Sequence, residues 1–174
     1  SPVNQRMKYE TYIGKEVPAF IDERYKTIAH REARAITGLS MGGHGAMFIG
    51  YRHAKTFGGI GSMSGAVDLE GLKKSRLIYN ILGDTTSNGK YYEDFNVLNI
   101  VQQYPADSVA IIIDCGVDDF LFEANQKLHE ELLKLKTPHD YIERPGKHDW
   151  PYWANAVEYQ LVFFRNYFDK MTGK

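Results

Sequence analysis

Short apolar runs alternate with longer segments of helical periodicity along most of the chain. The apolar runs predict four β-strands, at residues 33–38, 58–65, 108–115 and 139–143. Apolar side chains spaced three and four residues apart predict helices at residues 7–25, 41–52, 121–136 and 152–169. Strands that alternate with helices are typical of a parallel sheet covered on both faces, so the predicted fold class is α/β.

The predicted helices differ in their apolar faces. One face of the helix at residues 121–136 carries Leu121, Ala124, Leu128, Leu132 and Leu135. The last helix is expected to be lined by Val157, Leu161, Phe164 and Phe168. In the first helix, one side carries Tyr9, Ile13, Phe20 and Ile21, and Pro18 is expected to introduce a kink. Residues 67–107 are the least regular, and the sequence GDTTSNGK predicts a loop there with short helices on either side.

The residues Gly38 to Gly42 fit the pattern G-x-S-x-G between a predicted strand and a predicted helix. In such a turn the serine is held in an unfavourable backbone conformation, and we expect glycine to be required two residues before and two residues after it. Ser40 is therefore a candidate nucleophile above the carboxyl ends of the strands. The amide of Met41, at the start of the helix, is a candidate donor to a tetrahedral oxyanion.

An activated serine needs a base within hydrogen-bond distance and a carboxylate that orients this base. The chain contains six histidines, at positions 30, 44, 53, 129, 139 and 148. Only His148 directly follows a predicted strand, on the side of the sheet where Ser40 is expected, whereas the others lie on helices or at the opposite end of strands. His148 is therefore the candidate base.

The acid is expected after the third strand, within the sequence DCGVDDF. Asp114 is still in this strand or at its end, whereas Asp118 and Asp119 lie in the following loop, where a carboxylate could reach His148. Either of these two could instead cap the next helix, and spacing alone does not separate them.

Three stretches, GLSMGGHGA, CGVDDFLFEAN and ERPGKHDWPYW, together resemble an esterase family of the α/β-hydrolase fold. This family includes esterase D (S-formylglutathione hydrolase), tributyrin esterases and feruloyl esterases, and the resemblance extends over nearly the whole chain. It implies that the four strands form the C-terminal part of an α/β-hydrolase fold. The family pattern G-x-x-D-F-L assigns the acid to Asp119, and the elbow serine and the histidine map to Ser40 and His148. One departure is Lys147, where glycine is usual.

The same resemblance implies that residues 1–174 are a single α/β-hydrolase-type catalytic domain without its N-terminal strands. Family members carry a further N-terminal segment, which supplies these strands and a second oxyanion amide. We therefore expect the chain to be a fragment whose strand at residues 33–38 has an unpaired apolar edge. Either the missing segment or a second copy in a homo-oligomer is expected to cover that edge.

Composition excludes several classes of function. A net charge of −1 argues against a nucleic-acid partner, and no apolar run is long enough to span a membrane. The single cysteine, Cys115, excludes an internal disulfide and a cysteine-rich metal site. We expect an exported or periplasmic protein whose signal lies outside this chain, with a cytoplasmic location as the alternative.

These observations predict a serine carboxylesterase that needs no metal or organic cofactor. Ser40 would attack a small-molecule or carbohydrate-linked ester, His148 would take its proton, and Asp119 would orient the imidazole. Trp150, Tyr152 and Trp153 either line an acyl pocket or pack at the start of the last helix. The alternatives are an acyltransferase or thioesterase with the same triad, and a non-catalytic fragment that associates through its exposed sheet edge.

Overall fold

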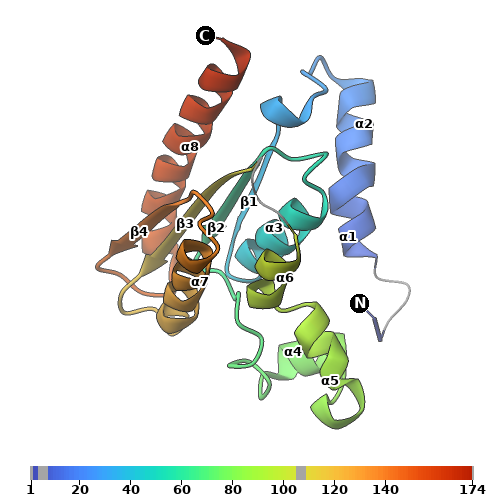
Figure 1. The fold of residues 1–174 in the computed structure, drawn as a ribbon, viewed down its shortest axis with the longest axis vertical. Helices are drawn as coiled ribbons and strands as arrows, with labels where there is room; N and C mark the ends of the chain where they lie inside the picture. Colours follow the sequence, from blue (N-terminus) through green and yellow to red (C-terminus); the bar gives the residue numbers. More distant parts are fainter. Residues whose placement is uncertain (1, 4–7, 105–108, 174) are drawn as a thin grey trace.

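The computed structural model describes residues 2–3, 8–104 and 109–173 and contains a four-stranded parallel sheet (Figure 1). The strands are β1 (Ala35–Leu39), β2 (Gly59–Met63), β3 (Ala110–Gly116) and β4 (Asp140–Arg144). They lie in the order β1-β2-β3-β4, and each pairs in parallel with its neighbour. The predicted α/β class and the parallel sheet are therefore confirmed.

Because the strands are parallel and in register, their carboxyl ends lie together along one side of the sheet. Leu39 pairs with Met63, Met63 pairs with Asp114, and Asp114 pairs with Ile142. The predicted nucleophile, acid and base lie in the segments that follow β1, β3 and β4, and these three segments all begin at the carboxyl ends of the strands.

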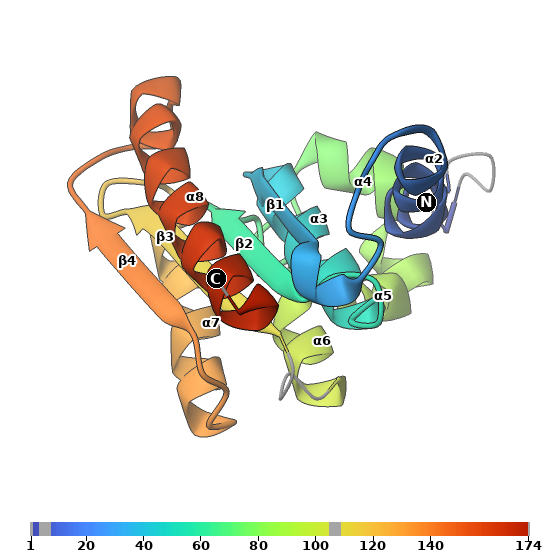
Figure 2. The ribbon, with the colours of Figure 1, turned by 90° about the horizontal axis from the view of Figure 1, so that it is seen from above.

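Helices cover both faces of the sheet, as predicted (Figure 2). On one face, α3 (Met41–Arg52) packs on β1 and β2, α7 (Phe122–Lys134) packs on β3, and α6 (Val97–Gln103) contacts both helices. On the other face, α8 (Trp150–Thr172) packs on β2 and β3. None of the helices among the described residues is both long enough and apolar enough to cross a membrane.

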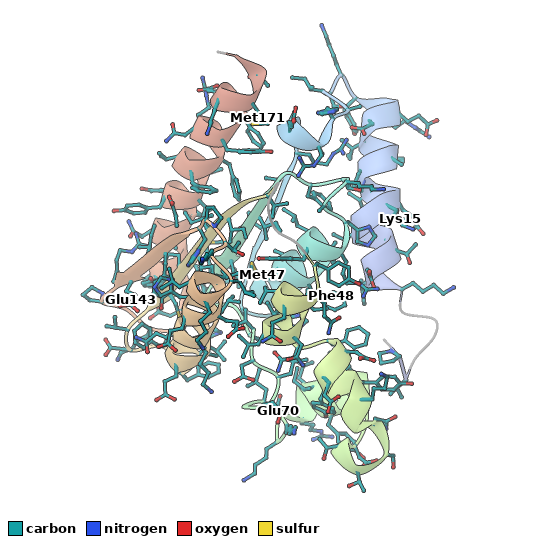
Figure 3. The ribbon with its side chains drawn as sticks, in the orientation of Figure 1. Lys15, Met47, Phe48, Glu70, Glu143 and Met171 are labelled. Carbon is teal, nitrogen blue, oxygen red and sulfur yellow. The ribbon has the colours of Figure 1, made fainter. Side chains whose placement is uncertain are left out.

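The main core lies between the sheet and the face that carries α3, α6 and α7. Its fully buried members include Met47 of α3, Ile60 of β2, Ile111 of β3 and Leu128 of α7. Figure 3 shows Met47 at the centre of the molecule, whereas Lys15 lies at its surface. This core fixes the strands and helices that carry the candidate site.

The sheet-facing side of α8 differs from the prediction. Phe164 is buried, but Leu161 is 64% exposed, because the buried side runs through Trp153, Ala156 and Gln160. Gln160 is fully buried: its carboxamide oxygen accepts a hydrogen bond from the Thr37 hydroxyl, and its nitrogen donates to the Ser62 carbonyl. Because Gln160 is polar, the spacing of apolar residues did not identify this side of α8 as the buried one.

The segment between β2 and β3 forms α4 (Arg76–Leu82), α5 (Thr85–Asp94) and α6. Only Gly83 and Asp84 connect α4 to α5, so much of the segment predicted as a loop, GDTTSNGK, is helical; α5 is nevertheless kinked at Asn88, whose φ of −125° and ψ of 24° are not helical. Gly83 has a positive φ of 81°, and the Asp84 carboxylate accepts hydrogen bonds from the amides of Thr86 and Ser87. This cap starts a helix in a sequence of low helix propensity.

The N-terminal helix is built from α1 (Tyr9–Thr11), a π-helical turn (Tyr12–Glu16) and α2 (Val17–Arg24). The π-helical turn ends two residues before Pro18, which lies in the first turn of α2, where its missing amide hydrogen is tolerated. The side predicted to be apolar, with Tyr9, Ile13, Phe20 and Ile21, is exposed. A short 3₁₀ turn, Arg31–Ala33, then precedes β1, which begins two residues later than predicted. β1 lies at one edge of the four-stranded sheet, and β4 lies at the other.

Candidate active site

Ser40 lies in a sharp turn between β1 and α3, with a positive φ of 55° and a ψ of −118°. This backbone conformation is rare and strained for a residue with a side chain. Both backbone polar groups of Ser40 are hydrogen-bonded to residues at or just after the end of β2. The Ser40 amide donates to the Met63 carbonyl at 2.9 Å, and the Ser40 carbonyl accepts from the Ala66 amide at 3.1 Å. The end of β2 therefore fixes the position of Ser40.

The glycines around Ser40 do not all have the predicted role. A Cβ atom on Gly38 would lie 2.5 Å from the backbone of Gly42, so glycine is required before the serine. A Cβ atom on Gly42 would meet nothing within 4 Å among the described residues, so the predicted requirement at Gly42 is wrong. Gly43, which the sequence analysis did not single out, would bring a Cβ within 2.7 Å of Ser62 Oγ and 2.9 Å of Gly65 Cα. The close approach of α3 to β2 therefore depends on Gly43.

Ser40, His148 and Asp119 form one continuous chain of hydrogen bonds. His148 Nε2 lies 2.9 Å from Ser40 Oγ, and His148 Nδ1 lies 2.8 Å and 3.0 Å from the two carboxylate oxygens of Asp119. With the carboxylate ionised, the N–H group at Nδ1 donates a hydrogen bond to Asp119, which leaves Nε2 as the acceptor for the serine hydroxyl. The structure thus brings together the three residues that the sequence and the family resemblance assigned.

The three candidate acids have different surroundings. Asp119 is 5% exposed, and its Oδ1 also accepts a hydrogen bond from the Leu121 amide at 2.8 Å. Asp118 is exposed and lies beside it in the same loop. Asp114 is fully buried and accepts hydrogen bonds from the Tyr152 hydroxyl and from the Arg144 guanidinium. Burial raises the pKa of Asp114, against the opposing effect of these two donors.

The loops that contain Asp119 and His148 are hydrogen-bonded to each other beyond the ends of β3 and β4. The Val117 amide donates to the Arg144 carbonyl, and the Asp118 amide donates to the Gly146 carbonyl, both at 2.9 Å. A Cβ atom on Gly116 would lie 2.4 Å from the Gly146 oxygen, so glycine permits this close approach. The distance between acid and base is therefore set by backbone contacts. Lys147, the departure from the family pattern, is exposed in this loop.

Aromatic residues surround the imidazole of His148. The ring of Trp153 lies edge-on to it, with centroids 4.8 Å apart, and the ring of Phe120 lies at 4.6 Å. Trp150 contacts Trp153 but is 72% exposed. Tyr152 is 6% exposed, and its hydroxyl donates a hydrogen bond to Asp114. It also lines a pocket together with Arg144 and Lys147.

The first residue of α3, Met41, directly follows Ser40. The first amides of a helix have no partner within the helix, and the helix dipole makes this end favourable for negative charge. An oxyanion that forms on an ester bound at Ser40 could therefore accept a hydrogen bond from the Met41 amide.

Other histidines of the chain have hydrogen-bond partners outside the triad. His44 bonds to the Phe95 carbonyl, His53 bonds to Glu10, and His129 bonds to His139. Among the described residues, no three histidine, cysteine, aspartate or glutamate side chains are placed to bind a metal ion together. Cys115 is fully buried, and burial raises the pKa of its thiol to about 12, so it is not a competing nucleophile.

The sequence of this site and its fold match known proteins. A sequence family described as "Putative esterase" matches residues 3–164. The chain belongs to this esterase family. The family resemblance drawn from the three sequence stretches is therefore confirmed, and the α/β-hydrolase-type fold of its members agrees with the parallel sheet described above.

Two relatives and one solved structure illustrate the similarity. An acetyl esterase of Caldicellulosiruptor saccharolyticus is 32% identical over 85% of this chain and 62% of its own length. An S-formylglutathione hydrolase of Arabidopsis thaliana is 26% identical over 84% of this chain and 52% of its own length. The structure of a ferulic acid esterase is 32% identical, with a TM-score of 0.79 over 92% of this chain and 62% of that one. The chain therefore spans about half to two thirds of the length of these relatives.

Proposed function

We propose that this chain is the triad-bearing part of a serine carboxylesterase, which cleaves acyl esters through an acyl-enzyme. The hydrogen-bond chain from Ser40 through His148 to Asp119 is the observation that carries this proposal. Family membership supports it independently, because the relatives named above are esterases or hydrolases. The proposed roles are Ser40 as nucleophile, His148 as general base and acid, and Asp119 as the carboxylate that orients His148.

In the first step, Ser40 Oγ attacks the carbonyl carbon of the ester while its proton passes to His148 Nε2. The imidazolium that forms is stabilised by Asp119, which accepts the hydrogen bond from Nδ1. The negative charge on the former carbonyl oxygen lies toward the Met41 amide at the start of α3. The tetrahedral intermediate then collapses: the carbon–oxygen bond to the alcohol breaks, and the alcohol leaves with the proton of Nε2.

In the second step, water takes the place of the alcohol. His148 Nε2 removes a proton from the water, and the resulting hydroxide attacks the carbonyl carbon of the acyl-Ser40 ester. The second tetrahedral intermediate collapses with cleavage of the bond to Ser40 Oγ, which regains its proton from His148. The carboxylic acid is released and the enzyme returns to its starting state. One imidazole serves both steps, so its position relative to Ser40 controls the whole cycle.

The names of the relatives suggest the class of substrate. They are an acetyl esterase, an S-formylglutathione hydrolase and a ferulic acid esterase. We propose an ester of a small-molecule or carbohydrate alcohol as the substrate. We also propose that residues 1–174 belong to a single α/β-hydrolase-type catalytic domain, in which additional N-terminal strands lie beside β1, because the relatives are longer than this chain.

The proposal is tested with a fluorophosphonate probe and with p-nitrophenyl acetate. The chain is expected to be labelled stoichiometrically at Ser40, as read from the modified peptide by mass spectrometry, and to hydrolyse the ester. The variant Ser40→Ala is expected to fold normally, to remain unlabelled and to lose about 10⁴-fold or more in kcat. A folded chain that is not labelled, or a Ser40→Ala variant with undiminished turnover, would contradict the proposed function.

A further inference from the structure

Two aromatic side chains contact the candidate base from different elements of the fold. Phe120, in the loop before α7, has its ring centroid 4.6 Å from that of His148, with an interplanar angle of 53°. Trp153, in the first turn of α8, has its ring centroid 4.8 Å away at 87°. Both distances lie in the range of direct ring contacts. The proposed reaction assigns no role to either ring.

The two residues differ in how they are held. Trp153 is 8% exposed, and its indole Nε1 donates a hydrogen bond at 3.2 Å to the hydroxyl of Ser64, which is fully buried. Ser64 directly follows β2 and has a positive φ of 47°. Its backbone amide donates a hydrogen bond to the Asp114 carbonyl of β3. Trp153 is therefore anchored to the sheet. Phe120 is 71% exposed, so its ring contributes little to the core.

Phe120 also adjoins the acid in the sequence. Its neighbour Asp119 is nearly buried and is bonded both to His148 and to the Leu121 amide. The backbone on both sides of Phe120 is thereby tied to the site, and the exposed ring lies beside the imidazole. The contact with His148 thus follows from the geometry of the acid loop.

We propose that Phe120 and Trp153 are positioning residues that hold the His148 imidazole between Asp119 and Ser40 during the reaction. This inference rests on the proposed esterase function. Trp153 is held by its hydrogen bond to Ser64 and limits rotation of the imidazole on one side. Phe120 limits this rotation from the side of the loop that contains Asp119. Neither residue needs to touch the ester for this role.

The chemical reason is the change of charge on His148. The imidazole is neutral before the attack and becomes an imidazolium ion when it takes the proton of Ser40. An aromatic ring attracts a cation that lies within about 6 Å of its face through its π electrons, and it attracts a neutral imidazole less. This attraction is assigned to the tilted ring of Phe120, whereas Trp153, which lies edge-on, acts by contact alone. The contact with Phe120 is therefore stronger in the transition state than in the resting enzyme, and it is expected to act on kcat rather than on KM.

The test compares variants of Phe120, because this exposed ring can be changed without disturbing the core. Phe120→Ala is expected to lower kcat about three- to tenfold, with KM changed less than about twofold. Phe120→Tyr retains an aromatic face and is expected to restore most of the rate. Phe120→Leu retains bulk without π electrons and is expected to resemble Phe120→Ala. Leu133→Ala, at an exposed apolar residue of α7 outside the loops that carry the triad, serves as the control and is expected to leave kcat unchanged.

Two esters with different acyl and alcohol groups, p-nitrophenyl acetate and α-naphthyl butyrate, separate positioning from substrate binding. Positioning predicts the same fold-loss in kcat for both esters and a parallel loss in the rate of fluorophosphonate labelling. A loss that lies mainly in KM, or that differs strongly between the esters, would show that Phe120 contacts the substrate instead. Full rescue by Phe120→Leu would show that bulk alone matters, and it would overturn the proposal.

The outcome also distinguishes this inference from the function on which it rests. Unimpaired turnover in Phe120→Ala, with an active parent chain and an inactive Ser40→Ala variant, would refute the positioning role and leave the esterase function standing. A parent chain that is folded but neither labelled nor active would refute both. Melting temperatures of all Phe120 variants are expected to lie close to that of the parent, because the ring is mostly exposed.

Discussion

At the scale of single residues, surroundings rather than residue type assign the roles at this site. Asp114, Asp118 and Asp119 lie within six positions of the sequence, yet one is buried beneath the site, one is exposed and one is bonded to His148. Alternation along a strand could not separate Asp118 from Asp119, because both lie in a loop where side-chain direction depends on turn geometry. The family resemblance separated them, and the observed contacts agree with its assignment.

The first prediction uses the two neighbouring aspartates as a matched pair. Asp119→Asn is expected to lower kcat for p-nitrophenyl acetate by about 10⁴-fold, because an amide in that position favours the wrong tautomer of the imidazole. Asp118→Asn, in the same loop but exposed, is expected to retain kcat within about threefold. Steady-state kinetics on both variants provide the measurement. A similar loss in the two variants would mean that the loop as a whole, rather than the carboxylate of Asp119, supports turnover.

At the scale of elements, apolar periodicity predicted the four strands and the long helices, although the N-terminal helix leaves its apolar side exposed. It failed where a polar group is buried or a side-chain cap starts a helix. Gln160 hides the buried side of α8, and Asp84 starts α5 where glycine, serine and threonine indicated a loop. Both features depend on hydrogen bonds to particular partners, which the pattern of apolar and polar positions does not record.

Packing between elements also decides which glycines of the serine turn matter. Gly43→Ala is expected to destabilise the protein by about 1–3 kcal/mol, because its Cβ would lie 2.7 Å from Ser62 Oγ and 2.9 Å from Gly65 Cα. Gly42→Ala places its Cβ in open space within the first turn of α3, and it is expected to leave stability unchanged or to raise it by up to about 1 kcal/mol. Urea denaturation of the two variants measures the difference. Equal destabilisation by both would contradict the described packing of α3 on β2.

At the scale of the whole molecule, the parallel sheet gathers residues that are far apart in the sequence. Ser40 and His148 are 108 positions apart, yet they lie within hydrogen-bond distance because the parallel strands β1 and β4 have their carboxyl ends on the same side of the sheet. The sequence predicted this convergence from the order of strands and helices. It did not predict contacts between side chains of different elements, such as Trp153 with Ser64 or His129 with His139, because periodicity carries no information about them.

The pair of His129 and His139 links the stability of the molecule to pH. His129 Nδ1 lies 2.7 Å from His139 Nε2, and His139 Nδ1 lies 2.8 Å from the Thr137 carbonyl. His139 therefore donates a hydrogen bond from Nδ1 to this carbonyl, and the ring of His129 stacks on that of Tyr141. Burial, together with the neighbouring His139, lowers the pKa of His129 below its ordinary value of 6.5.

A histidine whose pKa is lower in the folded state than in the unfolded state binds its proton more readily after unfolding. Its contribution to stability is complete above the ordinary value of 6.5, and it is lost as the pH falls through the lower folded pKa. The free energy of unfolding of the parent chain, minus that of His129→Gln, is therefore expected to fall between pH 7.5 and pH 5. Taking this difference removes the contributions of other groups, such as Asp114, whose pKa burial shifts upward. Urea denaturation at half-unit pH steps measures it, and a difference that stays constant or grows toward pH 5 would show that His129 is not held in its neutral form by the fold.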